Sequence, residues 1–131
     1  RAQGAGVILL TSSVSGLFGF PWRTPYVAAK WGIVGLTKAL ASELGPAGVR
    51  VNAICPGAVE GPRMGRVIAM EAQAQGRSEE DVRAGFTQGV ALRRFVTADE
   101  VAAMALFLAS PGAASISGQA MTVDGHTERT T

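Results

Sequence analysis

The sequence holds few of the residues that build disulfides, zinc sites or nucleic-acid interfaces. Its 131 residues include one cysteine, Cys55, and one histidine, His126. A lone cysteine excludes a disulfide within the chain, and without a cluster of cysteines and histidines we expect no metal site. Charged residues make up 17% of the chain and the net charge is +2. With no lysine-rich run, this balance predicts no nucleic-acid partner.

The sequence also lacks an apolar run of the roughly 20 residues that cross a membrane. Hydrophobic residues nevertheless account for 47% of the chain, which is typical of a globular protein rather than a disordered one. We expect one modest domain in a cytoplasmic protein that has no membrane partner.

Three short apolar runs are the candidate strands of a sheet. Residues 6–12 are apolar at consecutive positions, as in a strand covered on both faces of a parallel sheet. Residues 49–54 and 119–123 are the other two, and helical patterns separate the three, so we expect an α/β fold. Three parallel strands alone would leave residues 6–12 at an uncovered edge. We therefore expect the C-terminal portion of a larger, doubly wound parallel-sheet (Rossmann-like) domain.

The longest helix is expected over residues 25–44. Thr24 is placed to cap its start, and Pro25 suits the first helical position, where a missing N–H costs nothing. Gly45 followed by Pro46 provides the stop, with Gly45 accepting a left-handed cap. The helix is apolar on nearly every side, so we expect it to be buried on more than one side.

Residues 62–96 are the least regular part of the sequence. We expect two short helices here, the second weakened by Gly85 and Gly89, and we interpret the segment as a mobile flap over a substrate. A capping box formed by Thr97 and Glu100 then predicts the start of a further helix.

Tyr26 and Lys30 are four residues apart, so they share one face at the start of the long helix. A tyrosine hydroxyl in water is almost wholly protonated at neutral pH. A nearby ammonium and a helix N-terminus both favour its ionised form, so the pair can serve as a general acid and base. The same spacing also occurs by chance, in which case Tyr26 would be an interface residue and Lys30 a solvated one.

The surroundings of this pair favour the chemical interpretation. Ser13 follows the first predicted strand, and Pro56 and Gly57 follow the second. Together with the loop that leads to Tyr26 and Lys30, three loops therefore reach one edge of the sheet. Ligands bind at this edge in open parallel sheets. A serine hydroxyl there suits a hydrogen bond to a substrate oxygen. A serine hydrolase would need a histidine base, and His126 is the only histidine in the chain, so we expect no hydrolase.

This constellation resembles the short-chain dehydrogenase/reductase family, over essentially all of the chain. The resemblance implies an oxidoreductase that uses NAD or NADP to interconvert a secondary alcohol and a ketone, both small molecules. It rests on four segments: SSVSG at 12–16, YVAAK at 26–30, RVNAICPG at 50–57 and GQAMTVDG at 118–125.

The resemblance also implies a role for each residue at the predicted edge. Tyr26 is the acid and base, and Lys30 favours its ionised form and binds the nicotinamide ribose. Ser13 stabilises the reacting oxygen, which gains charge in the transition state. The competing interpretations are a non-catalytic Rossmann-like scaffold or assembly subunit, or an inactive fragment.

The cofactor is expected to lie over the loop that contains Pro56, Gly57 and Val59, which by resemblance runs under the nicotinamide. Many relatives have a threonine two residues beyond Val59, where this chain has Gly61. The family's glycine-rich pyrophosphate loop and the residue that distinguishes NAD from NADP lie upstream of Ser13. We therefore expect the N-terminal cofactor-binding half to be absent from residues 1–131.

Two further expectations concern the substrate and the subunits. The candidates for the substrate pocket are Ser15, Phe20 and Trp22. A structural role also readily explains Ser15, as it does Ser12. Phe20 and Trp22 are equally well explained as residues that pack a long loop. Relatives are commonly oligomeric, so we expect a homodimer or homotetramer that forms through helix 25–44.

Overall fold

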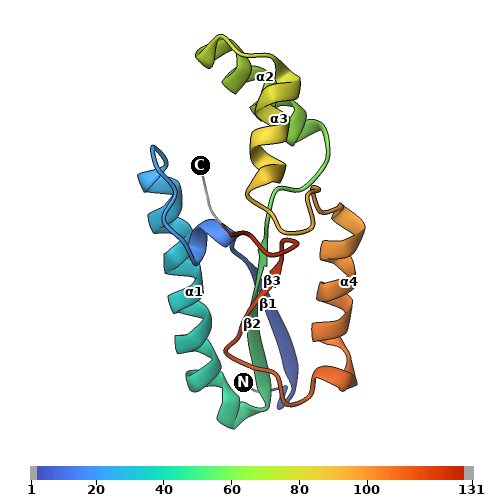
Figure 1. Cartoon of the computed structure of the whole chain (residues 1–131). Helices are drawn as coiled ribbons and strands as arrows, with labels where there is room; N and C mark the ends of the chain where they lie inside the picture. Colours follow the sequence, from blue (N-terminus) through green and yellow to red (C-terminus); the bar gives the residue numbers. More distant parts are fainter. Residues whose placement is uncertain (1–2, 129–131) are drawn as a thin grey trace.

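The computed structural model describes residues 3–128 of the chain, in which a parallel sheet lies between helices (Figure 1). The strand order is β1-β2-β3, and both strand pairs are parallel. Helix α1 covers one face of the sheet and α4 covers the other. The α/β fold class with a parallel sheet is therefore confirmed. The bounds are β1 Gly6–Thr11, α1 Thr24–Leu44, β2 Val49–Pro56, α2 Pro62–Gln75, α3 Glu79–Gln88, α4 Ala98–Ala109 and β3 Ala120–Val123.

Strand β2 is the centre of the core, because its side chains alternate between the two layers. Ala53 and Cys55 pack against Val34 of α1. Ile54, between them in the sequence, packs against Leu108 of α4. This alternation is what the two-residue period of a strand requires when both faces are covered.

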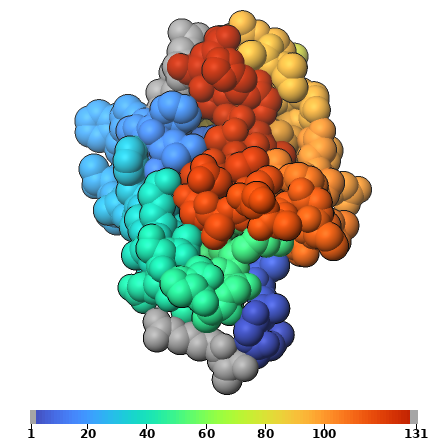
Figure 2. Space-filling model, turned by 90° about the horizontal axis from the view of Figure 1, so that it is seen from below, coloured from blue at the N-terminus to red at the C-terminus, as the bar shows by residue number. Residues whose placement is uncertain are grey.

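Strand β1 is an edge strand and is only half-buried, with 37% of Val7 exposed. Figure 2 shows the blue N-terminal residues at the rim of the molecule, while the orange segment before β3 covers the middle. The burial on both faces that the apolar run predicts is thus found in β2 and not in β1. The uncovered edge is the arrangement expected for three parallel strands alone.

Helix α1 has nearly the predicted bounds, but its ends form differently. Thr24 is the first helical residue rather than the cap, and the cap position belongs to Arg23, without a side-chain hydrogen bond. Pro25 lies in the first turn, as predicted. Gly45 keeps a right-handed φ of −53°, and Gly48 takes the left-handed conformation with φ of +75°. The left-handed cap comes three residues late because a 3-10 turn extends the helix.

Helices α2 and α3 form a hairpin that projects beyond the carboxyl edge of the sheet (Figure 1). The hairpin has its own small core of Ile68, Ala72, Val82 and Phe95. Gly85 lies within α3 and does not interrupt it. The helical flap predicted for residues 62–96 therefore has the expected secondary structure, and its mobility stays a prediction.

Helix α4 begins at the predicted capping box. The Glu100 amide donates to Thr97 Oγ1 at 3.2 Å, and the Thr97 amide donates to Glu100 Oε2 at 2.8 Å. Hydrogen bonds from the Arg94 guanidinium, followed by the Thr97 amide, lower the pKa of Glu100 to about 2. Among residues 3–128, no helix is long and apolar enough to cross a membrane.

Candidate active site

Ser13 lies at the carboxyl end of β1, where the chain turns into a short 3-10 helix over Val14–Gly16. Its Oγ accepts a hydrogen bond from the Ser15 amide at 3.1 Å, so the side chain caps this helix. The residue is 9% exposed. A hydroxyl that accepts one bond keeps its own proton for another partner. Ser13 can therefore donate a hydrogen bond to an oxygen placed above the sheet edge.

Tyr26 and Lys30 lie on one face of α1, in its first two turns. Lys30 Nζ is 5.5 Å from the centre of the Tyr26 ring, and 36% of Tyr26 is exposed. The ammonium also donates to the main-chain oxygen of Thr11, the last residue of β1, at 3.3 Å. An ammonium has three donors, so it can bind further partners while it holds this contact.

The loop after β2 is fixed on two sides. The Gly57 amide donates to the Val123 oxygen at 3.0 Å, and a Cβ on Gly57 would lie only 2.9 Å from the Asp124 Cβ. On the other side, Val59 forms an isolated parallel bridge with Val96. A side chain at position 57 would therefore push the loop away from β3.

Cys55 is buried beneath this edge and is not placed as a nucleophile. It is inaccessible to solvent and packs against Val34 and Ala53. Burial raises the pKa of the Cys55 thiol, more than the neighbouring Ser12 hydroxyl and Ser13 main chain lower it. The thiol therefore stays protonated at neutral pH and acts as a small core residue.

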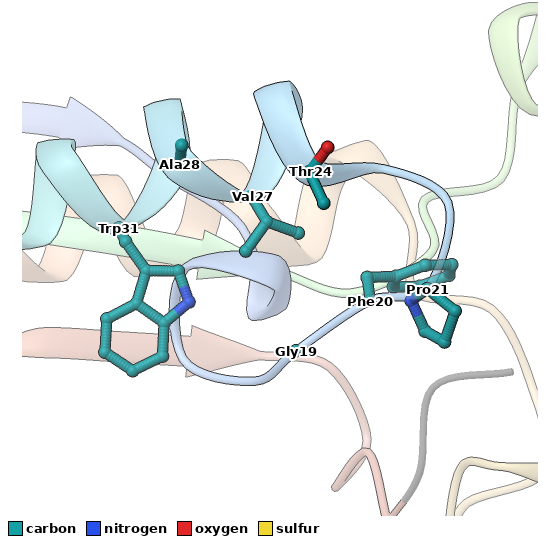
Figure 3. A pocket seen from close by; sticks show the side chains of 7 residues that line it. All are labelled: Gly19, Phe20, Pro21, Thr24, Val27, Ala28 and Trp31. Atoms are coloured by element: carbon teal, nitrogen blue, oxygen red, sulfur yellow. The ribbon is translucent and has the colours of Figure 1, made fainter.

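The structure does not bring the predicted substrate-pocket residues together. Phe20 lines a surface pocket with Val27 and Trp31 (Figure 3), and helical spacing places these two residues of α1 on another face than Tyr26. Trp22 is fully exposed, with φ of +64°, and Ser15 is buried, its amide bonded to Ser13 Oγ. The assignment of Ser15, Phe20 and Trp22 to a substrate pocket stays a prediction.

Two contacts explain the course of the loop that contains Phe20. Trp31 Nε1 donates to the Phe18 main-chain oxygen at 3.4 Å, which holds residues 18–22 against the outer side of α1. The Arg23 guanidinium lies 5.0 Å above the Phe20 ring and adds to the same arrangement. The sequence shows an aromatic loop between Ser13 and Tyr26, but no local signal for the side of the helix on which it lies.

Two features at this edge were not predicted. Arg23 lies 3.9 Å from Glu71, which connects the start of α1 to α2 across 48 positions of the sequence. His126 adopts φ of +64° just beyond β3, where the Asp124 carboxylate accepts hydrogen bonds from the amides of His126 and Thr127. Within residues 3–128, no group of three or more acidic, histidine or cysteine side chains is placed to bind a metal.

Comparison with known proteins finds dehydrogenases and reductases among the relatives of this chain. Residues 1–126 match a family model described as enoyl-(acyl carrier protein) reductase. D-beta-hydroxybutyrate dehydrogenase from Rhizobium meliloti (strain 1021) is 40% identical over 126 residues, covering 95% of this chain and 49% of that protein. A 3-oxoacyl-(acyl-carrier-protein) reductase from Chlamydia trachomatis (serovar D) is 39% identical over 121 residues, covering 92% and 44%.

Solved structures show the same fold. A variant of actinorhodin polyketide ketoreductase with NADPH superimposes with a TM-score of 0.90 at 38% identity, covering 98% of this chain and 49% of that one. Sorbitol-6-phosphate 2-dehydrogenase from Erwinia amylovora gives a TM-score of 0.89 at 32% identity, covering 95% and 49%. The chain spans about half the length of the relatives it matches.

Proposed function

Because the chain belongs to the short-chain dehydrogenase/reductase family, we propose that it contributes the reacting groups of an NAD(P)-dependent oxidoreductase. The reaction interconverts a secondary alcohol and a ketone. One observation carries this proposal: a serine hydroxyl, a tyrosine and a lysine ammonium lie at the carboxyl edge of one parallel sheet, with Lys30 Nζ 5.5 Å from the Tyr26 ring. The test is the loss of hydride transfer in a Tyr26→Phe variant.

Each of the three residues has a distinct task in the proposed reaction. In the direction of oxidation, Tyr26 Oη takes the proton of the substrate hydroxyl, and in reduction it returns a proton to the ketone oxygen. Ser13 Oγ donates a hydrogen bond to that oxygen while its charge changes. The Lys30 ammonium favours the ionised tyrosine by its positive charge.

The residues present fit the nicotinamide end of the cofactor. The Lys30 ammonium uses one donor on Thr11 and has others for ribose hydroxyls. The half-buried loop that contains Pro56, Gly57 and Val59 offers main-chain groups to the carboxamide. When bound, NAD or NADP supplies the hydride chemistry.

The same residues do not provide a pyrophosphate site. Gly4 precedes β1 and Gly6 is the first residue of that strand, whereas the dinucleotide-binding glycines follow a strand and open a helix. We infer that these residues form the C-terminal portion of the domain, with the N-terminal cofactor-binding half upstream. The sequence of the complete protein checks this inference directly.

We predict that the isolated chain of 131 residues does not bind NADH or NADPH with useful affinity, because it holds only the nicotinamide end. The measurement is a fluorescence titration of each nucleotide with the chain. A full-length dehydrogenase of the family, titrated under the same conditions, is the positive control. Saturable binding at micromolar concentrations would contradict the prediction.

We also propose that the exposed side of α1 forms a subunit interface. Trp31 and Leu36 are each 49% exposed, and a Cβ on Gly32 or Gly35 would meet nothing within 4 Å. Small residues beside large apolar ones allow a second helix to approach closely. A homodimer or homotetramer through this helix remains the favoured arrangement.

Val34→Lys would not test this interface, because Val34 is 8% exposed and packs on β2. Leu36→Lys is the better variant, because it charges the exposed side and leaves the core intact. We expect sedimentation velocity to show dissociation into smaller species. Lys38→Ala, which changes a residue of the same helix without charging that side, is the control. An unchanged sedimentation coefficient for Leu36→Lys would rule out the interface.

A further inference from the structure

We propose that Ser12 is a positioning residue, whose hydroxyl sets the separation between Ser13 and the Tyr26–Lys30 pair by binding the main chain of Lys30. This inference rests on the proposed function. Its place beside Ser13 in the sequence indicates only a structural role.

Ser12 connects two layers of the fold at the point where β1 ends. Its amide donates to the Ile54 oxygen of β2 at 2.8 Å. Its Oγ donates to the Lys30 oxygen of α1, also at 2.8 Å, and the residue is only 3% exposed. One buried residue therefore holds the sheet and the helix together, immediately before Ser13.

Lys30 is held at both of its ends by consecutive residues. Its carbonyl accepts from Ser12, and its ammonium donates to the Thr11 oxygen at 3.3 Å. A main-chain oxygen has two lone pairs, so the Lys30 carbonyl can accept the Ser12 proton and still take part in the helix. The end of β1 thus holds the residue that favours the ionised form of the Tyr26 hydroxyl.

Gly16 allows this close approach. A Cβ at position 16 would lie 2.3 Å from Ser12 Oγ and 2.8 Å from the Lys30 oxygen. The Gly16 amide donates to the Ser13 oxygen at 2.9 Å. Ser13 therefore lies between Ser12, which binds the Lys30 carbonyl, and a turn whose Gly16 leaves no room for a side chain beside that carbonyl.

This junction matters because proton transfer depends steeply on geometry. A base must come within about 2.6–3.2 Å of the proton donor, and a misplacement of about 1 Å can reduce the rate about 100-fold. Removal of the Ser12 hydroxyl deletes the only hydrogen bond that the structure records between the Ser12 side chain and α1. Helix α1 would then remain folded, but Ser13 and Lys30 could move relative to each other.

The experiment compares Ser12→Ala with Thr37→Val in the complete protein. Thr37 is 1% exposed, and its hydroxyl also donates to a carbonyl of α1, that of Ile33, at 2.8 Å. Each variant removes a buried hydroxyl that donates a hydrogen bond to a main-chain carbonyl of α1. Both should therefore lower the midpoint of thermal unfolding to a similar extent. Of these two hydroxyl bonds, that of Ser12 connects the helix to the end of β1, whereas that of Thr37 stays within the helix.

We expect Ser12→Ala to lower kcat about 10- to 100-fold, with a smaller change in KM. Thr37→Val should retain the wild-type kcat and KM. If Ser12→Ala retains both as well, or if Thr37→Val changes them equally, the inference is wrong.

Two further measurements keep the result interpretable. If Ser12→Ala does not fold, Ser12→Cys takes its place, because a cysteine has a side chain of similar size and forms a weaker hydrogen bond. A wild-type kcat for Ser12→Cys would overturn the inference. Tyr26→Phe is measured in parallel. Turnover in Tyr26→Phe would contradict the proposed function itself, whereas an inactive Tyr26→Phe beside an unaffected Ser12→Ala contradicts only the role of Ser12.

Discussion

The Tyr26→Phe variant of the complete protein is expected to lose hydride transfer by about 1,000-fold, within the range that general acid–base catalysis contributes. The substitution removes only the hydroxyl, so the ring stays beside the Lys30 ammonium, 5.5 Å from its centre. Without Oη, no group on this face of α1 can take the proton of an alcohol or return one to a ketone. The measurement is the absorbance change of the nicotinamide during turnover of a secondary alcohol.

The control for this variant is the intact fold. Tyr26 is 36% exposed, so losing its hydroxyl leaves no buried group without a partner, and the unfolding transition should not move. Tyr26 is also the only tyrosine of the sequence, so phenolate absorbance in this chain reports on that residue alone. Turnover near the wild-type rate would instead favour a non-catalytic scaffold that retains the motif.

The sequence predicted those parts of the fold that depend on local pattern. The three strands, the long helix and the capping box at Thr97 are present with bounds that differ by one or two residues. Consecutive apolar residues and a capping side chain act within a few positions of the chain, so they can be recognised without knowledge of the fold. The shared face of Tyr26 and Lys30 follows in the same way from a spacing of four residues.

Features that depend on distant contacts could not be predicted. Val34 and Leu36 are both apolar residues of one helix, yet Val34 packs on the sheet and Leu36 lies on the surface. A helix that is apolar on nearly every side gives no signal for which side faces inward. The outward course of Phe20 depends likewise on a bond between Trp31 and Phe18 that no local pattern specifies.

The role of Ser12 shows the same limit within the candidate site. Its partner Lys30 is 18 positions away, and a serine at the end of a strand has many possible partners. The motif SSVSG drew attention to Ser13 because a hydroxyl at the sheet edge suits a substrate. Only the packing of β1 against α1 shows that the preceding serine holds the lysine.

Asn52→Ala is expected to cause a large loss of stability, about 3 kcal/mol in the free energy of unfolding. Asn52 is inaccessible to solvent. Its Nδ2 donates to the Ile116 oxygen at 2.9 Å, and its Oδ1 accepts from the Gln119 amide at 3.0 Å. Both partners belong to the segment that leads into β3, so the side chain fixes where that strand begins.

The expected loss is large because the substitution removes the partner of the Gln119 amide and leaves the Ile116 oxygen with the Arg50 guanidinium as its donor, at 3.2 Å. An unpaired buried donor or acceptor costs about 1–3 kcal/mol, and neither group can rotate away, because each belongs to the backbone. Denaturant unfolding of the protein measures the difference. Ser42→Ala is the matched control, since its exposed hydroxyl also donates to a main-chain oxygen, that of Lys38, and we expect a change within about 0.5 kcal/mol.

A loss below about 1 kcal/mol for Asn52→Ala would mean that water replaces the amide in the space it leaves. The main-chain bonds around Asn52 would then suffice to place β3: the Gly118 amide donates to the Val51 oxygen at 2.7 Å, and the Ala53 amide donates to the Gln119 oxygen at 2.8 Å. We expect the larger loss, because these two bonds lie on either side of Asn52 and neither of them provides a partner for the Gln119 amide, which donates to the Asn52 side chain.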